Sequence, residues 1–100
     1  MDINHQNPSI CIPRIFKHIS IPFIIDIFQN KLLFGKIKNI DVVDISGNND
    51  YKKIFIHFYN WYTNESAIDN KNKILNDETI KIVYDNPWFW KCSLNRAKNK

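Results

Sequence analysis

Apolar and polar residues alternate most regularly in the middle of the chain, from Tyr51 to Tyr59, and this period of two predicts a strand. One face of that strand carries Ile54, Ile56 and Phe58. The opposite face carries Lys53, Phe55 and His57. Shorter alternating or β-branched runs predict further strands at Ile10–Ile12, Ile37–Ile45 and Thr79–Tyr84. The sequence therefore predicts four strands of unequal length.

The segment between the first two strands predicts a break followed by a helix. Pro13 and Arg14 end the first strand or place it at an edge or a bulge. Ser20 is a favourable N-cap, and Pro22 fits the first turn of a helix, so we expect a helix over about 21–30. Its apolar face carries Ile24, Phe28 and either Ile21 or Ile25. A strand competes here, because isoleucine is not a strong helix former.

A second helix is expected between the last two strands, beginning at Thr63 or Asn64 and ending near Leu75. The element order is then βαββαβ, which suits the split βαβ arrangement. Right-handed crossovers place both helices on one face of a four-stranded antiparallel sheet and leave the other face open. We therefore expect a single α+β domain over residues 9–84, after a short polar segment at 1–8.

Residues 85–100 are expected to form an aromatic and basic extension outside this plan, because Asp85, Asn86 and Pro87 break the last strand. The cluster Trp88–Phe89–Trp90 is too apolar to be left in water. Three alternatives stay open for it. It packs on the open face of the sheet over Phe55, it contacts a protein partner or a second copy, or it stacks on nucleic-acid bases.

The positive charge lies mainly at the carboxyl end of the chain. The formal net charge is +4, yet residues 1–90 hold ten Lys and Arg against ten Asp and Glu. The excess comes from Lys91, Arg96, Lys98 and Lys100. The main body is therefore neutral, unlike the strongly basic body of many nucleic-acid-binding domains.

No constellation typical of an enzyme, a metal site or a membrane protein is found in the sequence. Cys11 and Cys92 form no zinc-ligand set, and the three histidines have no metal-ligand spacing. There is no glycine-rich phosphate loop and no Ser/His/Asp spacing. No apolar run approaches the roughly 18 residues of a membrane helix, and no signal-peptide pattern is present. We expect a soluble, intracellular, non-enzymatic protein without a cofactor, whose cysteines are free thiols.

The segment Tyr51–Phe58 resembles RNP1, the longer signature of the RNA recognition motif (RRM). Phe55 matches its second base-stacking aromatic, whereas Lys53 occupies the place of the first. Residues Ile10–Ile15 resemble the shorter signature, RNP2, with Cys11 at the stacking position. The resemblance implies the ferredoxin-like fold of the family and binding of RNA or single-stranded nucleic acid. Two of the three expected stacking positions are not aromatic, which implies weaker binding.

The last predicted strand and the extension, from Thr79 to Arg96, resemble small RRM-like proteins of giant DNA viruses. The chain contains 18 Ile and 14 Asn, a bias that agrees with an AT-rich genome. This resemblance implies a viral protein in the host cytoplasm or nucleus, or in the virion.

Two hypotheses follow for the function. The first is binding of RNA or single-stranded nucleic acid. The residues expected to make the contacts are Cys11, Arg14, Lys53, Phe55, His57, Lys81, Trp88, Trp90 and Arg96. The second is a protein interaction or self-association module, such as a virion assembly component, which uses the sheet face or the Trp88–Trp90 segment.

Overall fold

The computed structural model describes residues 5–96, which form an α+β fold with one five-stranded antiparallel sheet. The strand order across the sheet is β2-β3-β1-β5-β4. The strands are β1 (Ile10–Phe16), β2 (Gly35–Asp44), β3 (Tyr51–Trp61), β4 (Ile80–Asp85) and β5 (Trp88–Leu94). The helices are α1 (Ile21–Ile25), a π-helical continuation η1 (Asp26–Lys31) and α2 (Glu65–Leu75). None of the helices within residues 5–96 is long and apolar enough to cross a membrane.

The expected four-stranded sheet is wrong, because residues 88–94 supply a fifth strand. A ferredoxin-like order would place the strand after α2 next to β1. In this structure β5 occupies that position, with Ile10 opposite Leu94, and β4 lies at the edge. The ferredoxin-like order is therefore not confirmed. The physical reason is the turn at residues 86–87, which allows β5 to fold back on β4 and to bury its alternate residues.

Strand β1 is longer than predicted and contains a bulge. Ile12 lies opposite Ile54, but the next paired residue, Ile15, lies opposite Lys52, so β1 carries one extra residue. Pro13 lies in this bulge, as expected of a residue that has no N–H to donate to a ladder. After the bulge β1 continues to Phe16, well beyond the expected strand at Ile10–Ile12.

The two predicted helices form near their expected positions. The Ser20 hydroxyl accepts a hydrogen bond from the Phe23 amide, so this N-cap is as predicted. The expected helix over 21–30 is divided into a short α-helix and the π-helical segment η1, a change for which the sequence offers no signal. Asn64 caps α2 by accepting a hydrogen bond from the Ala67 amide at 2.8 Å.

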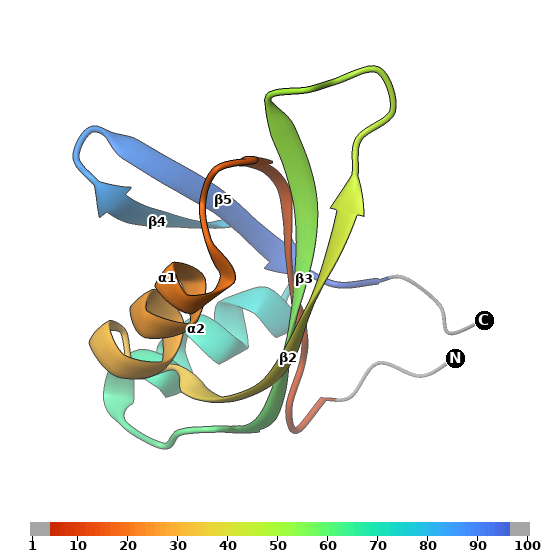
Figure 1. Cartoon of the computed structure of the whole chain (residues 1–100). Helices are drawn as coiled ribbons and strands as arrows, with labels where there is room; N and C mark the ends of the chain where they lie inside the picture. The colour runs from red at the N-terminus through yellow and green to blue at the C-terminus, as the bar shows by residue number, and fades with distance from the viewer. Residues whose placement is uncertain (1–4, 97–100) are drawn as a thin grey trace.

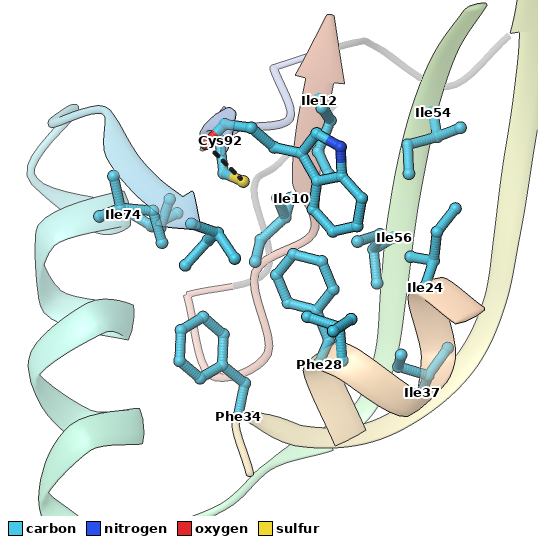
Figure 2. Packing of buried hydrophobic residues seen from close by; sticks show 14 of the residues in the cluster. Ile10, Ile12, Ile24, Phe28, Phe34, Ile37, Ile54, Ile56, Ile74 and Cys92 are labelled. Atoms are coloured by element: carbon cyan, nitrogen blue, oxygen red, sulfur yellow. Dashed lines mark hydrogen bonds between the residues drawn. The ribbon is translucent and has the colours of Figure 1, made fainter. Parts of the chain in front are cut away.

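The core lies between the helices and one face of the sheet. Figure 2 shows isoleucines of β1 and β3 facing Ile24 and Phe28 across this layer, with Ile74 of α2 beside them. The alternation that predicted β3 is confirmed, because Ile54 and Ile56 are fully buried. The opposite face of β3 is only partly exposed and has no helix over it.

The β4–β5 hairpin diverges from the β2–β3 pair (Figure 1). The ladder between β1 and β5 joins only two pairs of residues, Ile10 with Leu94 and Cys11 with Ser93. Beyond Cys11 the two strands separate, and their facing edges are not paired with one another. We call the space between residues 13–16 of β1 and 88–91 of β5 the fork.

Candidate functional site

The centre of the open sheet face carries the residues that resemble the RRM signature. Phe55 is half-buried and lies opposite Cys11 on β1 and Asp41 on β2. The Lys53 ammonium lies 6.0 Å from the centre of the Phe55 ring. The structure therefore brings Cys11, Lys53 and Phe55 together.

His57 lies further along the same face, in more acidic surroundings. Its Nε2 is 2.8 Å from a carboxylate oxygen of Asp41, and its Nδ1 is 2.7 Å from the Ser9 hydroxyl. Both ring nitrogens are thus engaged within the protein. This end of the face is poorly suited to a phosphate, because the Asp41 carboxylate would repel it.

The fork combines six aromatic side chains from four strands. A pocket of about 360 Å³ lies there. Its aromatic lining consists of Phe16, Tyr51, Tyr84, Trp88, Phe89 and Trp90. Phe16 and Tyr51 stack with ring centres 5.0 Å apart, and Trp88 meets Phe16 edge-on at 5.6 Å. Trp88 is 53% exposed, so part of this lining faces solvent.

A second pocket of about 570 Å³ adjoins the first and is basic. Arg14 and Phe89 line both pockets, so the two adjoin there. Lys53 and Lys91 complete the charged lining of the second pocket, and no Asp or Glu lines either of these two pockets. The Lys81 ammonium lies 4.3 Å from the centre of the Phe89 ring, which adds a fourth cation at the rim. A third pocket shares Phe16, Tyr84 and Trp88 with the first and is also lined by Asp85.

Arg14 is held at the junction of the two pockets. Its guanidinium carbon lies 5.1 Å from the centre of the Tyr51 ring, a cation–π distance. Such a contact orients the side chain while its N–H groups stay available to other acceptors. Arg14 is therefore placed to reach a group that enters either pocket.

Trp90 does not lie over the open sheet face, so the alternative in which the aromatic cluster packs over Phe55 does not hold for this residue. Its side chain is 2% exposed and belongs to the core on the helix side of the sheet. The indole stacks between Tyr84, at 4.3 Å, and Phe28, at 5.9 Å. The alternation of β5 explains this position, because Trp90, Cys92 and Leu94 are all buried. Trp88 and Phe89 remain largely exposed at the fork.

Arg96 also lies away from the fork, paired with a residue that follows α2. It forms a two-pronged ion pair with Asp77, with N–O distances of 2.6 and 3.0 Å. This pairing offsets its charge. Lys98 and Lys100, the other cations of the predicted basic extension, lie outside the described residues.

The two cysteines are poor candidates for reactive thiols. Burial raises the pKa of Cys11, and the nearby charge of Lys53 lowers it by a smaller amount. Burial raises the pKa of Cys92 further. Within residues 5–96 no group of three His, Cys, Asp or Glu side chains could hold a metal ion.

Sequence reasoning missed several residues of the fork. Phe16, Tyr51 and Lys91 were not among the expected contact residues, and Phe89 was considered only as part of the Trp88–Phe89–Trp90 cluster. The usable signal was the alternation of Trp90, Cys92 and Leu94, which marks a half-buried strand. Comparison of the chain with known protein families, with curated proteins and with solved structures finds no match.

Proposed function

We propose that this protein binds single-stranded nucleic acid in the fork. The observation that carries the proposal is the lining of the two adjoining pockets, in which exposed aromatic rings lie beside four cations, whereas the nearest carboxylate, Asp85, lines a third pocket on the other side of Trp88. The resemblance of residues 51–58 to RNP1 supports the same function. The binding surface differs from that of the RRM signature, because it lies between β1 and β5 instead of over the centre of the sheet.

The chemistry of the lining matches the two parts of a nucleotide. Stacking of a base on an aromatic ring stabilises a complex by about 1–3 kcal/mol per base and tolerates any sequence. Trp88 and Phe89 offer such rings at the surface of the fork. Arg14, Lys53 and Lys91 line the neighbouring pocket, where phosphates would lie. Since the rest of the described chain is close to neutral, this local excess of positive charge would select the binding site.

Fluorescence anisotropy of labelled RNA and DNA single strands tests the proposal. Strands of about 10 nucleotides are suitable, within the usual site size of about 4–16. Each phosphate contact in a single strand contributes a slope of about −0.7 to log K against log salt. Three contacts give a slope near −2, so raising salt from about 50 to about 200 mM should weaken binding about 16-fold.

Two paired variants locate the surface. Lys53→Gln combined with Lys91→Gln should reduce the salt slope by about 1.4, because two phosphate contacts are lost. The matched control combines Lys36→Gln with Lys73→Gln, which removes two exposed lysines from β2 and α2. The control should leave both affinity and slope unchanged. Absence of binding at about 50 mM salt, or equal losses in the two variants, would refute the proposal.

The unpaired strand edges at the fork favour a second candidate, in which a protein segment adds a strand. Only two residue pairs join β1 to β5, so backbone groups beyond Cys11 are available to an extended peptide. A second copy of the chain, as in a viral assembly component, would use the same edges. This candidate predicts a concentration-dependent dimer in sedimentation velocity, or binding of a Thr-Val repeat peptide. Either result without nucleic-acid binding would favour it.

A further inference from the structure

The third pocket differs in the sign of its charge from the two pockets that Arg14 lines. It has a volume of about 610 Å³. Asp85 is the one carboxylate in its lining, and no Lys or Arg of residues 5–96 lines it. Aromatic rings form most of the remaining lining, namely Phe16, His18, Phe23, Tyr84 and Trp88. Aromatic walls beside a carboxylate favour a cationic ligand and disfavour a phosphate.

Four of these rings stand in two nearly perpendicular pairs. Phe16 and Trp88 meet at 76° with their centres 5.6 Å apart, and Phe23 and Tyr84 meet at 82° with their centres 6.3 Å apart. Two rings at right angles can both turn a face toward a group that lies in the angle between them. The face of a ring carries negative charge and attracts a cation within about 6 Å of its centre. Trp88 and Phe23 are 53% and 37% exposed, so part of each ring is open to a ligand.

The Asp85 carboxylate is available to a ligand. Within residues 5–96 it pairs with no Lys, Arg or His, whereas four other aspartates each pair with one of these. Its charge acts on the pocket wall, since burial and, by a smaller amount, Asp85 raise the pKa of Tyr84. Lys52 lies close to another wall, because its ammonium donates to the Ile19 carbonyl at 2.7 Å, but it is buried and does not line the pocket. The lining is therefore net negative.

We infer that the third pocket binds a quaternary ammonium group, the head of choline or of a choline phosphate. Such a group has no N–H, so it needs no hydrogen-bond acceptor, and its methyl groups pack against aromatic faces. A choline phosphate fits better than a methylated lysine, because Arg14 lines the adjoining first pocket and attracts an anion next to the ammonium. Lys53 and Lys91 do not line the third pocket, so the inference goes beyond the proposed function and does not depend on it.

A neutral isostere of choline separates attraction of the charge from burial of the methyl groups. The full chain is titrated at constant ionic strength with choline chloride and with 3,3-dimethylbutan-1-ol, in which a carbon replaces the nitrogen. The indole N–H resonance of Trp88 reports binding. Choline should bind about 10-fold more tightly than the alcohol, because several ring faces attract the cation. Phosphocholine should bind about threefold more tightly than choline, and Arg14→Gln should remove this gain.

Two variants with matched controls locate the site. Asp85→Asn should weaken choline binding about threefold, whereas Asp69→Asn, at an exposed position of α2, should not change it. Phe23→Leu keeps an apolar side chain but removes a ring face, so it should also weaken binding about threefold. Its control is Tyr59→Leu, because Tyr59 is 60% exposed and lines none of the three pockets. If Phe23→Leu does not fold, Asp85→Asn carries the test, since it changes an exposed side chain.

The outcomes distinguish the ligand and its source. If the neutral alcohol binds as tightly as choline, or if Asp85→Asn and Asp69→Asn behave alike, the inference is wrong. A trimethyllysine peptide that binds more tightly than phosphocholine would also overturn it. Sedimentation with vesicles of pure phosphatidylcholine, reversed by free phosphocholine, would identify a lipid headgroup as the source; binding of phosphocholine without sedimentation would identify a free choline phosphate. Loss of nucleic-acid binding alone would refute the proposed function and leave this site standing.

Discussion

The two deeply buried tryptophans, Trp90 and Trp61, allow the energetic cost of an unpaired indole N–H to be measured without any ligand. Trp90 and Trp61 are 2% and 5% exposed. Trp90 stacks on two aromatic rings, whereas Trp61 stacks on Phe34 and lies tilted against Phe58. They differ in that the indole N–H of Trp61 donates to the Pro8 carbonyl, whereas that of Trp90 has no partner among residues 5–96. Replacement by phenylalanine removes the same ring atoms at both positions. At Trp90 it also removes an unpaired donor, whereas at Trp61 it breaks a hydrogen bond.

The expected magnitudes differ clearly. In both variants the loss of two ring carbons costs about 1.5 kcal/mol at about 0.8 kcal/mol per carbon. Trp90→Phe also removes an unpaired buried donor, which returns about 1–3 kcal/mol, so the net effect on its free energy of unfolding should lie between a loss of about 0.5 and a gain of about 1.5 kcal/mol. Trp61→Phe loses a hydrogen bond and leaves the buried Pro8 carbonyl unpaired, so it should be destabilised by about 3 kcal/mol or more.

Urea unfolding followed by far-UV circular dichroism checks this prediction, because that signal does not depend on the number of tryptophans. The midpoints should differ while the slopes m stay equal. In thermal unfolding the gap of about 3 kcal/mol corresponds to about 12 °C or more for a domain of this size. Equal destabilisation of Trp90→Phe and Trp61→Phe would refute the reasoning, since it would mean that the Trp90 N–H is satisfied in the free protein.

Three further predictions concern the frame around the site. Gly35→Ala should lower the free energy of unfolding by about 3 kcal/mol, because the new Cβ would lie 2.8 Å from the Cα atom of Trp61 in β3. Gly47→Ala should cost only about 1–2 kcal/mol, because its backbone is left-handed but the space around it is open. Equal urea midpoints for the two variants would contradict this. Asn64→Ala should cost about 1–2 kcal/mol by removing the cap of α2, and Asn64→Asp should restore only part of it, because a carboxylate can cap the helix but cannot donate to the Leu33 carbonyl as the Asn64 amide does. The rate at which Cys11 reacts with a thiol reagent should still increase as the pH is raised beyond the usual thiol pKa of about 8.5, because burial raises the pKa of Cys11. Cys92 should not react until the protein unfolds. A rate for Cys11 that reaches its plateau below about pH 8 would count against this.

Most secondary structure could be predicted from local patterns in the sequence. The alternation in β3 and the caps Ser20 and Asn64 are local signals, and the structure bears them out. The continuation of β1 past Pro13 depends instead on pairing with β3, which no local pattern reports. The division of the first helix at Asp26 likewise has no local cause in the residue types.

The position of the site could not be predicted, because it depends on which strand lies beside β1. The predicted βαββαβ order ends at Tyr84, and it therefore leaves residues 85–100 to an extension. Trp90, Cys92 and Leu94 nevertheless alternate in burial like the residues of a strand. Once β5 pairs with β1, Phe89 and Lys91 come to lie beside Arg14 and Lys53. Phe89 and Lys91 are more than 30 positions away from both Arg14 and Lys53 in the sequence. Sequence reasoning identified Arg14, Lys53 and Trp88 by their chemistry but placed them on a different surface.

The fork and its unpaired indole have a common structural origin in the way β1 is built. Pro13 has no N–H, so it cannot extend a ladder, and the β1–β5 ladder ends two residues earlier at Cys11. A longer ladder would draw β5 against β1 and close the groove between them. Because the strands separate here, the pocket between them extends as far as Trp90, which remains part of the core on the helix side of the sheet. The unpaired donor of Trp90 lowers the stability of the free protein. A ligand that binds between the two separated strands should therefore stabilise the fork more than any other part of the sheet.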